Sequence, residues 1–368
     1  MSGERRPPKE YGSGGLGRRS LWRDGRLWIG LLFSLACLAL AFYGVDLAEV
    51  GAALRGVDPV WLAVALFVTL ITTVAKAGRW RLLIKLDSSP LDRSGDSSGF
   101  SLGIGRLTSI WQAGAALNLA LPAPRSGDVA RAYLAGEAGG VSKSLVLGTI
   151  AAEKSLDIVM LAVSFLILLP FMTLPSELET RRGSIVGLAV IVPLVIIVVL
   201  WQRQRFLGWT HDILMRSPGS WGNTLFGSAE RAVQGLDALS RPRTVLILAL
   251  ISVGIWFLAT LTNYCVFLAM HLPPSWIQSL FVLVVLQAGI ILPSTPGKIG
   301  VFQVLCRWSL VFFGYSATIG LAYGILLYMV APLAIMLTGA ITLVWESWQL
   351  RQSPKTIGTL AIGSDDVT

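Results

Sequence analysis

Long apolar runs separated by short polar segments make up most of the chain. The runs of spanning length are Leu27–Val45, Pro59–Gly78, Ser144–Pro170, Ile185–Trp201, Val245–Met270, Trp276–Leu292 and Ala317–Trp345. Each run reaches the roughly 17 residues of the shortest transmembrane helices. The pattern predicts an all-α, polytopic helical membrane protein with about 7–8 spans, including one or two re-entrant or broken helices.

The composition points to the same class. Apolar residues other than glycine make up 54% of the 368 positions, charged residues only 14%, and the mean hydropathy is +0.68. Even without the 38 glycines, the apolar share exceeds the roughly 45–50% that soluble domains reach with glycine included. A soluble globular chain and a disordered chain are both excluded.

Basic residues predict the orientation, because cytoplasmic loops retain Lys and Arg. Seven lie in the N-terminal tail, six in residues 76–106 and six in 202–243, but only one in 46–58. We therefore expect a multi-pass protein of the cell membrane with a cytoplasmic N-terminus. The domains would be a basic cytoplasmic tail (1–26), a membrane domain (27–346) and a C-terminal tail (347–368). The loop 202–243 would be cytoplasmic and contain an amphipathic helix in 223–240, where apolar residues recur at helical spacing.

Two shorter apolar runs do not fit a simple alternation of spans. Ile104–Leu121 lies between basic stretches that both favour the cytoplasm, so we expect a re-entrant hairpin there. Ile299–Phe313 has only about 15 residues and can either span or re-enter. If it spans, the C-terminus is cytoplasmic; if it re-enters, the C-terminus is outside.

A first polar cluster interrupts the apolar pattern between Asn118 and Tyr133. Ser126 is expected to cap a short helix that begins at Gly127 and ends near Gly139. The N-terminus of such a helix presents free N–H groups and the positive end of its dipole to an anion. Arg125 would add a full positive charge beside it.

Charged side chains continue this cluster. Asp128 and Arg131 are three residues apart and can pair on one helix face. Glu153, Lys154 and Asp157 follow inside the next apolar run, where Lys154 can reach Asp157. The charges fit either a structural ion-pair network between helices or a polar path for a lipid head group or a proton, and Lys154 could also reach the interface.

The second polar cluster is LPSTPGKIGVFQ, at residues 292–303. Pro293 and Pro296 break a helix, Gly297 lets other backbone approach closely, and Lys298 places a charge near the start of the next helix. Taken alone, this stretch could be a loop between spans. However, LP-x-P-x-x-G at 121–127 and LP-x-x-P-G-x-x-G at 292–300 form a pair, and paired broken segments often mark a transporter's substrate site.

Both clusters carry a family resemblance. LN-x-x-LP-x-P-R-x-GD-x-x-R from Leu117, followed by EK-x-x-D at 153–157, resembles the flippase-like membrane family that includes the membrane domain of lysylphosphatidylglycerol synthases. PSTPGKIGVFQ at 293–303 resembles the second signature of that family. This chain departs from the signature at two positions: Lys298 replaces the more usual glycine, and Gln303 replaces the more usual glutamate. The chain therefore lacks the acidic group of that signature. The resemblance covers most of residues 27–346.

The resemblance implies a lipid flippase or lipid-handling transporter for an anionic, aminoacylated or polyprenyl-linked lipid. The chain ends about 20 residues after its last span, so we expect no aminoacyl-transferase domain and no enzymatic activity. Arg125, Arg131 and Lys298 would hold the head group. Glu153 and Asp157 would hold these three cations in place or carry protons. The candidate substrate-binding residues are Asn118, Arg125, Gly127, Asp128, Arg131, Glu153, Lys154, Asp157, Pro293, Pro296, Gly297 and Lys298.

Two other functions fit the sequence less well. A polyprenyl-phosphate-dependent glycosyltransferase would use acidic residues of the first external loop, here Asp46, Glu49 and Asp58. A non-transporting membrane scaffold would use its basic surfaces to bind anionic lipid or a protein. The expected partners are membrane lipids with anionic head groups, and a membrane protein or a second copy of the chain.

Other ligands are not indicated. The formal charge of +9 is explained by attraction to the inner leaflet, so no nucleic acid is expected. The chain has no GxxxxGK[ST] nucleotide-binding motif. Its three cysteines and two histidines lack metal-ligand spacing, so we expect no metal and no cofactor.

Overall fold

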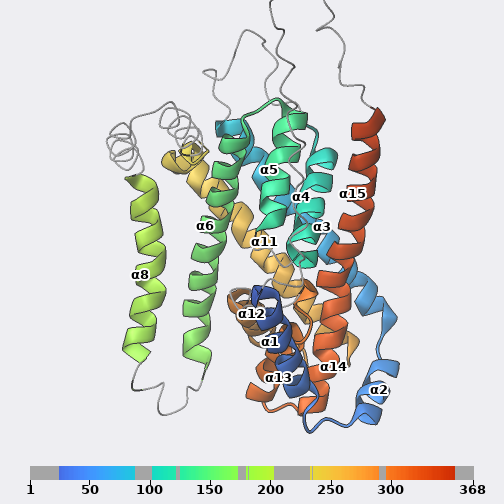
Figure 1. Ribbon diagram of the computed structural model, residues 1–368. Coiled ribbons are helices and arrows are strands. Elements are labelled where there is room, and N and C mark those ends of the chain that lie inside the picture. The colour runs from blue at the N-terminus through green and yellow to red at the C-terminus, as the bar shows by residue number, and fades with distance from the viewer. Residues whose placement is uncertain are drawn as a thin grey trace, which may run out of the picture.

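The computed structural model describes residues 25–87, 102–121, 125–172, 180, 182–202, 233, 235–289 and 296–352. Every regular element in this part of the chain is helical, which confirms the all-α membrane class (Figure 1). The elements are α1 (Gly25–Phe42), α2 (Leu47–Arg55), α3 (Pro59–Asp87), α4 (Ile104–Ala120), α5 (Ser126–Gly139), α6 (Lys143–Leu168), η3 (Leu169–Phe171), α8 (Arg182–Trp201), η4 (Asp237–Ser240), α11 (Pro242–Ala269), α12 (Trp276–Gly289), η5 (Pro296–Lys298), α13 (Val301–Phe312), α14 (Ala317–Tyr328), η6 (Met329–Leu333) and α15 (Ala334–Gln352).

Within the described ranges, four helical stretches are long and apolar enough to cross a membrane. They are Pro59–Asp87, Lys143–Phe171, Pro242–Ala269 and Ala317–Trp345. A fifth is counted if α1 and α2, which meet at an angle of 80°, form one broken span. The total of about 7–8 expected from sequence is reached only by also counting the shorter apolar helices α8, α12 and α13.

Helices α4 and α5 form a hairpin that enters the molecule from the upper end in Figure 1 and turns back near its middle. They have 17 and 14 residues, which at 1.5 Å per residue is less than the roughly 30 Å of a hydrocarbon core. The hairpin therefore extends beyond the expected Ile104–Leu121: that run forms a single helix, α4, and the returning arm is α5.

A second hairpin enters from the opposite end. Helix α12 rises from the lower end of Figure 1, and α13 returns beside it after η5. The run expected to span at Trp276–Leu292 contains α12, whose 14 described residues are fewer than a membrane-spanning helix needs. Residues 290–292 of that run lie outside the described residues.

The last helices run back toward the upper end of Figure 1. Helices α14, η6 and α15 run together from the lower to the upper end. The end of α15 thus lies at the same end as the turn between α5 and α6. Helix α13, in the run Ile299–Phe313, has 12 residues and packs beside α12. The two alternatives for this run, and the side on which the C-terminus lies, stay predictions.

Long-range packing binds the hairpins to the spans. Helix α3 packs along α11, α15 packs along α4, and α13 packs along α14. Lys76 lies within the expected run Pro59–Gly78, and Arg79 also falls inside α3, because that helix continues nine residues beyond Gly78. The expected tails and most of the amphipathic helix in 223–240 lie outside the described residues and stay predictions.

Candidate functional site

A buried ion pair joins the first hairpin to α6. Arg131 Nη2 lies 2.7 Å from Glu153 Oε2, and the two residues are only 2% and 1% exposed. Asp128 Oδ1 lies 3.8 Å from Arg131 Nη1, so the expected pairing on one face of α5 is present. Two carboxylates therefore surround the one guanidinium, and the positive charge of Arg131 is already neutralised.

Aromatic rings close over the same guanidinium. Its carbon lies 4.2 Å from the ring centroid of Trp80 and 5.7 Å from that of Trp111. The indole N–H of Trp111 donates to Glu153 Oε1 at 3.4 Å. Guanidinium–ring contacts of this kind are strongest when water is excluded. Arg131 thus has the surroundings of a structural residue in a helix interface.

The turn between α4 and α5 is held by Asn118. Its Oδ1 accepts from the Gly127 N–H at 2.9 Å, and its Nδ2 donates to Asp128 Oδ1 at 3.0 Å. The expectation that Ser126 caps this helix is wrong: α5 begins at Ser126, whose hydroxyl donates to the Leu117 carbonyl instead. The residue before it, Arg125, has φ 63° and directs the chain into the helix.

These contacts bear on the expected anion site at the start of α5. The Gly127 N–H is occupied by Asn118. Arg125 is exposed and does not line the cavity described below. The structure thus separates Arg125 from Arg131, although they are close in sequence.

A second ion pair, between the buried Arg79 and the partly exposed Asp157, was missed by the sequence analysis. Arg79 of α3 lies 2.7 Å from Asp157 of α6, and its other terminal nitrogen donates to Ser252 of α11 at 2.9 Å. Lys154, the expected partner of Asp157, is exposed and makes no ion pair among the described residues. The missed indication was the position of Arg79, only one residue beyond an apolar run that continues as helix.

The described part of the second cluster is a tight turn. Gly297, Lys298 and Gly300 all have positive φ, of 80°, 55° and 89°. The Tyr328 hydroxyl donates to the Gly297 carbonyl at 2.8 Å, and Gln303 Oε1 accepts from the Gly300 N–H at 2.7 Å. Pro293 lies outside the described residues, and Pro296 begins η5.

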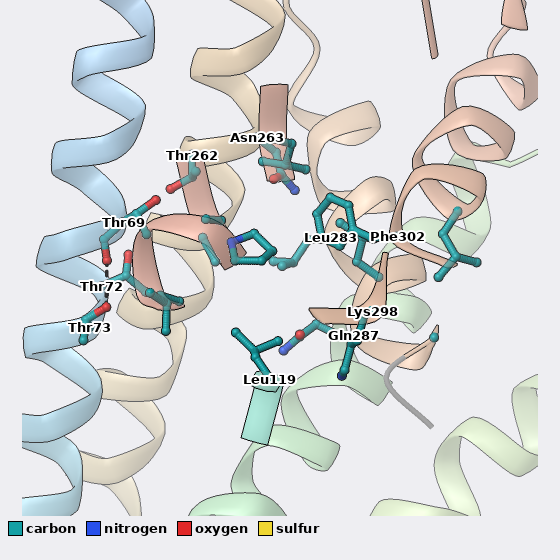
Figure 2. Close-up of a pocket in the computed structure, with 18 of the residues that line it drawn as sticks. Thr69, Thr72, Thr73, Leu119, Thr262, Asn263, Leu283, Gln287, Lys298 and Phe302 are labelled. Atoms are coloured by element: carbon teal, nitrogen blue, oxygen red, sulfur yellow. Dashed lines mark hydrogen bonds between the residues drawn. The ribbon is translucent and has the colours of Figure 1, made fainter. Parts of the chain in front are cut away.

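A cavity of about 250 Å³ lies where the two hairpins meet. The end of α4 contributes Leu119, and η5 contributes Lys298. Figure 2 shows three threonines of α3 on one side and Lys298 with Gln287 of α12 on the other. The polar or charged lining residues are Thr69, Thr72, Thr73, Lys76, Trp111, Thr262, Asn263, Gln287 and Lys298, and the remaining lining residues are apolar.

The two lysines of this cavity have no acidic partner. Neither Lys76 nor Lys298 forms an ion pair within 4.0 Å among the described residues. Lys76 lies over the Trp111 ring, with its Nζ 5.4 Å from the centroid. An ammonium withdrawn from water is costly unless it is paired, so the site favours an anion.

The residues that line the cavity differ from those expected to form the binding site. Of the candidate residues that the structure describes, which leaves out Pro293, Lys298 is the only one that lines it, and Lys76 was not a candidate. Glu153 pairs with Arg131, one of the cations it was expected to hold, whereas Asp157 pairs with Arg79, which was not among them. No group of histidine, cysteine and acidic residues suited to a metal occurs in the described ranges.

Two of the three acidic residues in the loop expected to be external cap helices. Asp46 accepts from the Ala48 N–H at 2.8 Å and caps α2. Asp58 accepts from the Val60 N–H at 2.8 Å, at the start of α3. Helix capping accounts for both aspartates without a glycosyl-transfer reaction.

Comparison with known proteins now identifies the family. The family model of the lysylphosphatidylglycerol synthase TM region matches residues 27–339. The chain belongs to this family. The match includes both polar clusters, so the resemblance seen in the motifs is confirmed.

One relative of this membrane family is a UPF0104 membrane protein from Methanocaldococcus jannaschii. It is 25% identical over 239 residues, which cover 65% of this chain and 97% of the relative. No solved structure is significantly similar to the chain. The comparisons thus place the chain in a family of membrane regions.

Proposed function

We propose that this membrane protein is a flippase or lipid-handling transporter for a lipid with an anionic head group. The observation that carries the proposal is the cavity at which two hairpins from opposite ends of the molecule meet, with Lys76 and Lys298 in its wall. The helices of both hairpins end near the middle of the molecule and do not cross it (Figure 1). Paired broken helices end at the same depth in transporters, where they form the substrate site.

Two ion pairs support this proposal because they hold the helices in place: the buried pair Arg131–Glu153, and Arg79–Asp157, whose aspartate is 27% exposed. The pair Arg131–Glu153 joins α5 to α6, and the pair Arg79–Asp157 joins α3 to α6. Their charges cancel inside the helix interfaces. The head group would therefore bind Lys76 and Lys298, while its acyl or isoprenyl chain remained in the surrounding lipid.

Orientation in the cell membrane is part of the proposal. The ends of α3 and α8, which lead into the basic loops, lie at the upper end of Figure 1. The positive-inside rule makes this end cytoplasmic, together with the N-terminus. The α4–α5 hairpin would then enter from the cytoplasm and the α12–α13 hairpin from outside.

Filling the cavity should stop lipid movement. Ala259 of α11 lines the cavity, so a phenylalanine at this position would occupy it. We expect Ala259→Phe in reconstituted vesicles to lower the rate at which a fluorescent phosphatidylglycerol changes leaflet by at least about tenfold, a barrier increase of about 1.4 kcal/mol. The rate is measured as the fraction of fluorophore that dithionite, added outside, can reduce over time.

The matched control is Val253→Phe on the same helix, where the valine side chain is 53% exposed on the outer surface. This variant should transport like wild type. Unchanged transport by Ala259→Phe would contradict the assigned path. Wild-type rates equal to those of protein-free vesicles for both phosphatidylglycerol and a polyprenyl phosphate would reject transport and favour the scaffold function.

A further inference from the structure

The charges that line the cavity restrict the chemistry of the lipid. The lining contains Lys76 and Lys298 but no aspartate or glutamate. The nearest network of carboxylates is already engaged, because Glu153 pairs with Arg131 and Asp157 pairs with Arg79. The cavity wall is therefore positively charged.

Neutral groups of the wall do not offset this charge. The hydroxyls of Thr69, Thr72 and Thr73 donate to carbonyls four residues earlier in α3, at 2.7–3.1 Å. The side-chain nitrogen of Asn263 donates to the Ser279 carbonyl at 3.0 Å. These groups could accept a hydrogen bond from a ligand, but none brings a negative charge.

The residue that caps α13 is neutral as well. Gln303 is 7% exposed, and its amide oxygen accepts from the Gly300 N–H at 2.7 Å. A carboxylate could accept the same bond and would place a negative charge in the first turn of α13, three residues after Gly300. Because an amide stands here, the cap itself brings no negative charge to the segment that carries Lys298.

We infer that this cavity selects lipids whose head group carries a phosphate and a net negative charge, and excludes lipids whose head group is aminoacylated. The inference rests on the proposed transport function and narrows its substrate class. A phosphate offers several oxygens to two ammonium groups. A lysyl ester would bring two further ammonium groups into a wall that has no carboxylate to receive them, and like charges repel most strongly where water is excluded.

The apolar part of the lining fits the rest of such a lipid. Leu283, Leu286, Phe302 and Leu305 face the cavity together with the two lysines. A cavity with cations and apolar side chains accommodates a phosphate and the first segment of its hydrocarbon chain. Both a glycerophospholipid and a polyprenyl phosphate have this chemistry.

The test compares lipids on the wild-type protein in vesicles. Four fluorescent lipids are supplied separately: phosphatidylglycerol, a polyprenyl phosphate, phosphatidylcholine and lysyl-phosphatidylglycerol. We expect at least one of the first two to cross at least tenfold faster than lysyl-phosphatidylglycerol, and the faster of the two names the source of the phosphate. Equal or faster movement of lysyl-phosphatidylglycerol would overturn the inference and leave the transport function standing. Movement of none of the four would overturn the transport function itself.

Two variants test whether the cavity causes the selection. Lys76→Met with Lys298→Met should lower the rate for the anionic lipids at least tenfold, whereas Lys143→Met, which removes a lysine paired with Glu137 at the surface, should not. Gln303→Glu keeps the acceptor for the Gly300 N–H and adds one negative charge. It should therefore lower the ratio of the transport rate for the anionic lipids to the rate for lysyl-phosphatidylglycerol. An unchanged ratio in both cavity variants would contradict selection by these charges.

Discussion

Replacing Glu153 by alanine is expected to lower the free energy of unfolding by about 3–5 kcal/mol. The substitution leaves Arg131, which is 2% exposed, without the carboxylate that lies 2.7 Å from it. Asp128, at 3.8 Å, is too distant to replace that contact. The variant should unfold at a markedly lower temperature than wild type in detergent, followed by tryptophan fluorescence or by the fraction that aggregates.

Two further variants show whether the loss of stability in Glu153→Ala comes from the buried charge or would follow any substitution in this region. Glu137→Ala removes the carboxylate of the Lys143–Glu137 pair, whose side chains are 48% and 39% exposed, and should change stability by about 1 kcal/mol or less. Arg131→Met combined with Glu153→Met removes both buried charges and should recover most of the stability. If Glu153→Ala behaves like Glu137→Ala, the pair does not stabilise the interface between α5 and α6.

The class and much of the local structure could be predicted from sequence. Helix α5 ends at Gly139 with Gly140 in the left-handed region, as the glycine pair indicates. A hairpin beginning at Ile104 was expected from its basic flanks, but Ile104–Ala120 is only its first arm, and Arg131 of the second flank is buried against α6. These features depend on neighbouring residues, so a single sequence contains them.

Long-range partners could not be predicted in this way. Arg79 and Asp157 are 78 positions apart, and nothing local distinguishes Asp157's true partner from Lys154, three residues away. Lys76 lies inside the expected run Pro59–Gly78, but it was counted with the basic residues of 76–106 and was not considered as a site residue. The cap on α5 was assigned wrongly because the left-handed backbone at Arg125 gave that role to Asn118.

Adding a single methyl group at Gly127 is expected to prevent the first hairpin from closing. A Cβ at this position would overlap the carbonyl oxygen of Gly114 and lie 2.8 Å from the Asn118 side chain. The backbones of α4 and α5 touch here, so the obstacle is a carbonyl that cannot rotate away. Overpacking typically costs about 1–3 kcal/mol, and loss of the Asn118 hydrogen bond adds about 1 kcal/mol. We expect Gly127→Ala to give little folded protein in size-exclusion chromatography.

Gly105→Ala is the matched control, because it lies on α4 and a Cβ there meets no atom within 4 Å. Alanine has the higher helix propensity, so this variant should be as stable as wild type or more stable by up to about 1 kcal/mol. Gly114→Ala should resemble Gly127→Ala, since its Cβ would overlap the Arg131 side chain and displace it from Glu153. A normally folded Gly127→Ala protein would show that α4 and α5 are further apart than described. It would also remove the reason why the chain needs glycine on both faces of the hairpin.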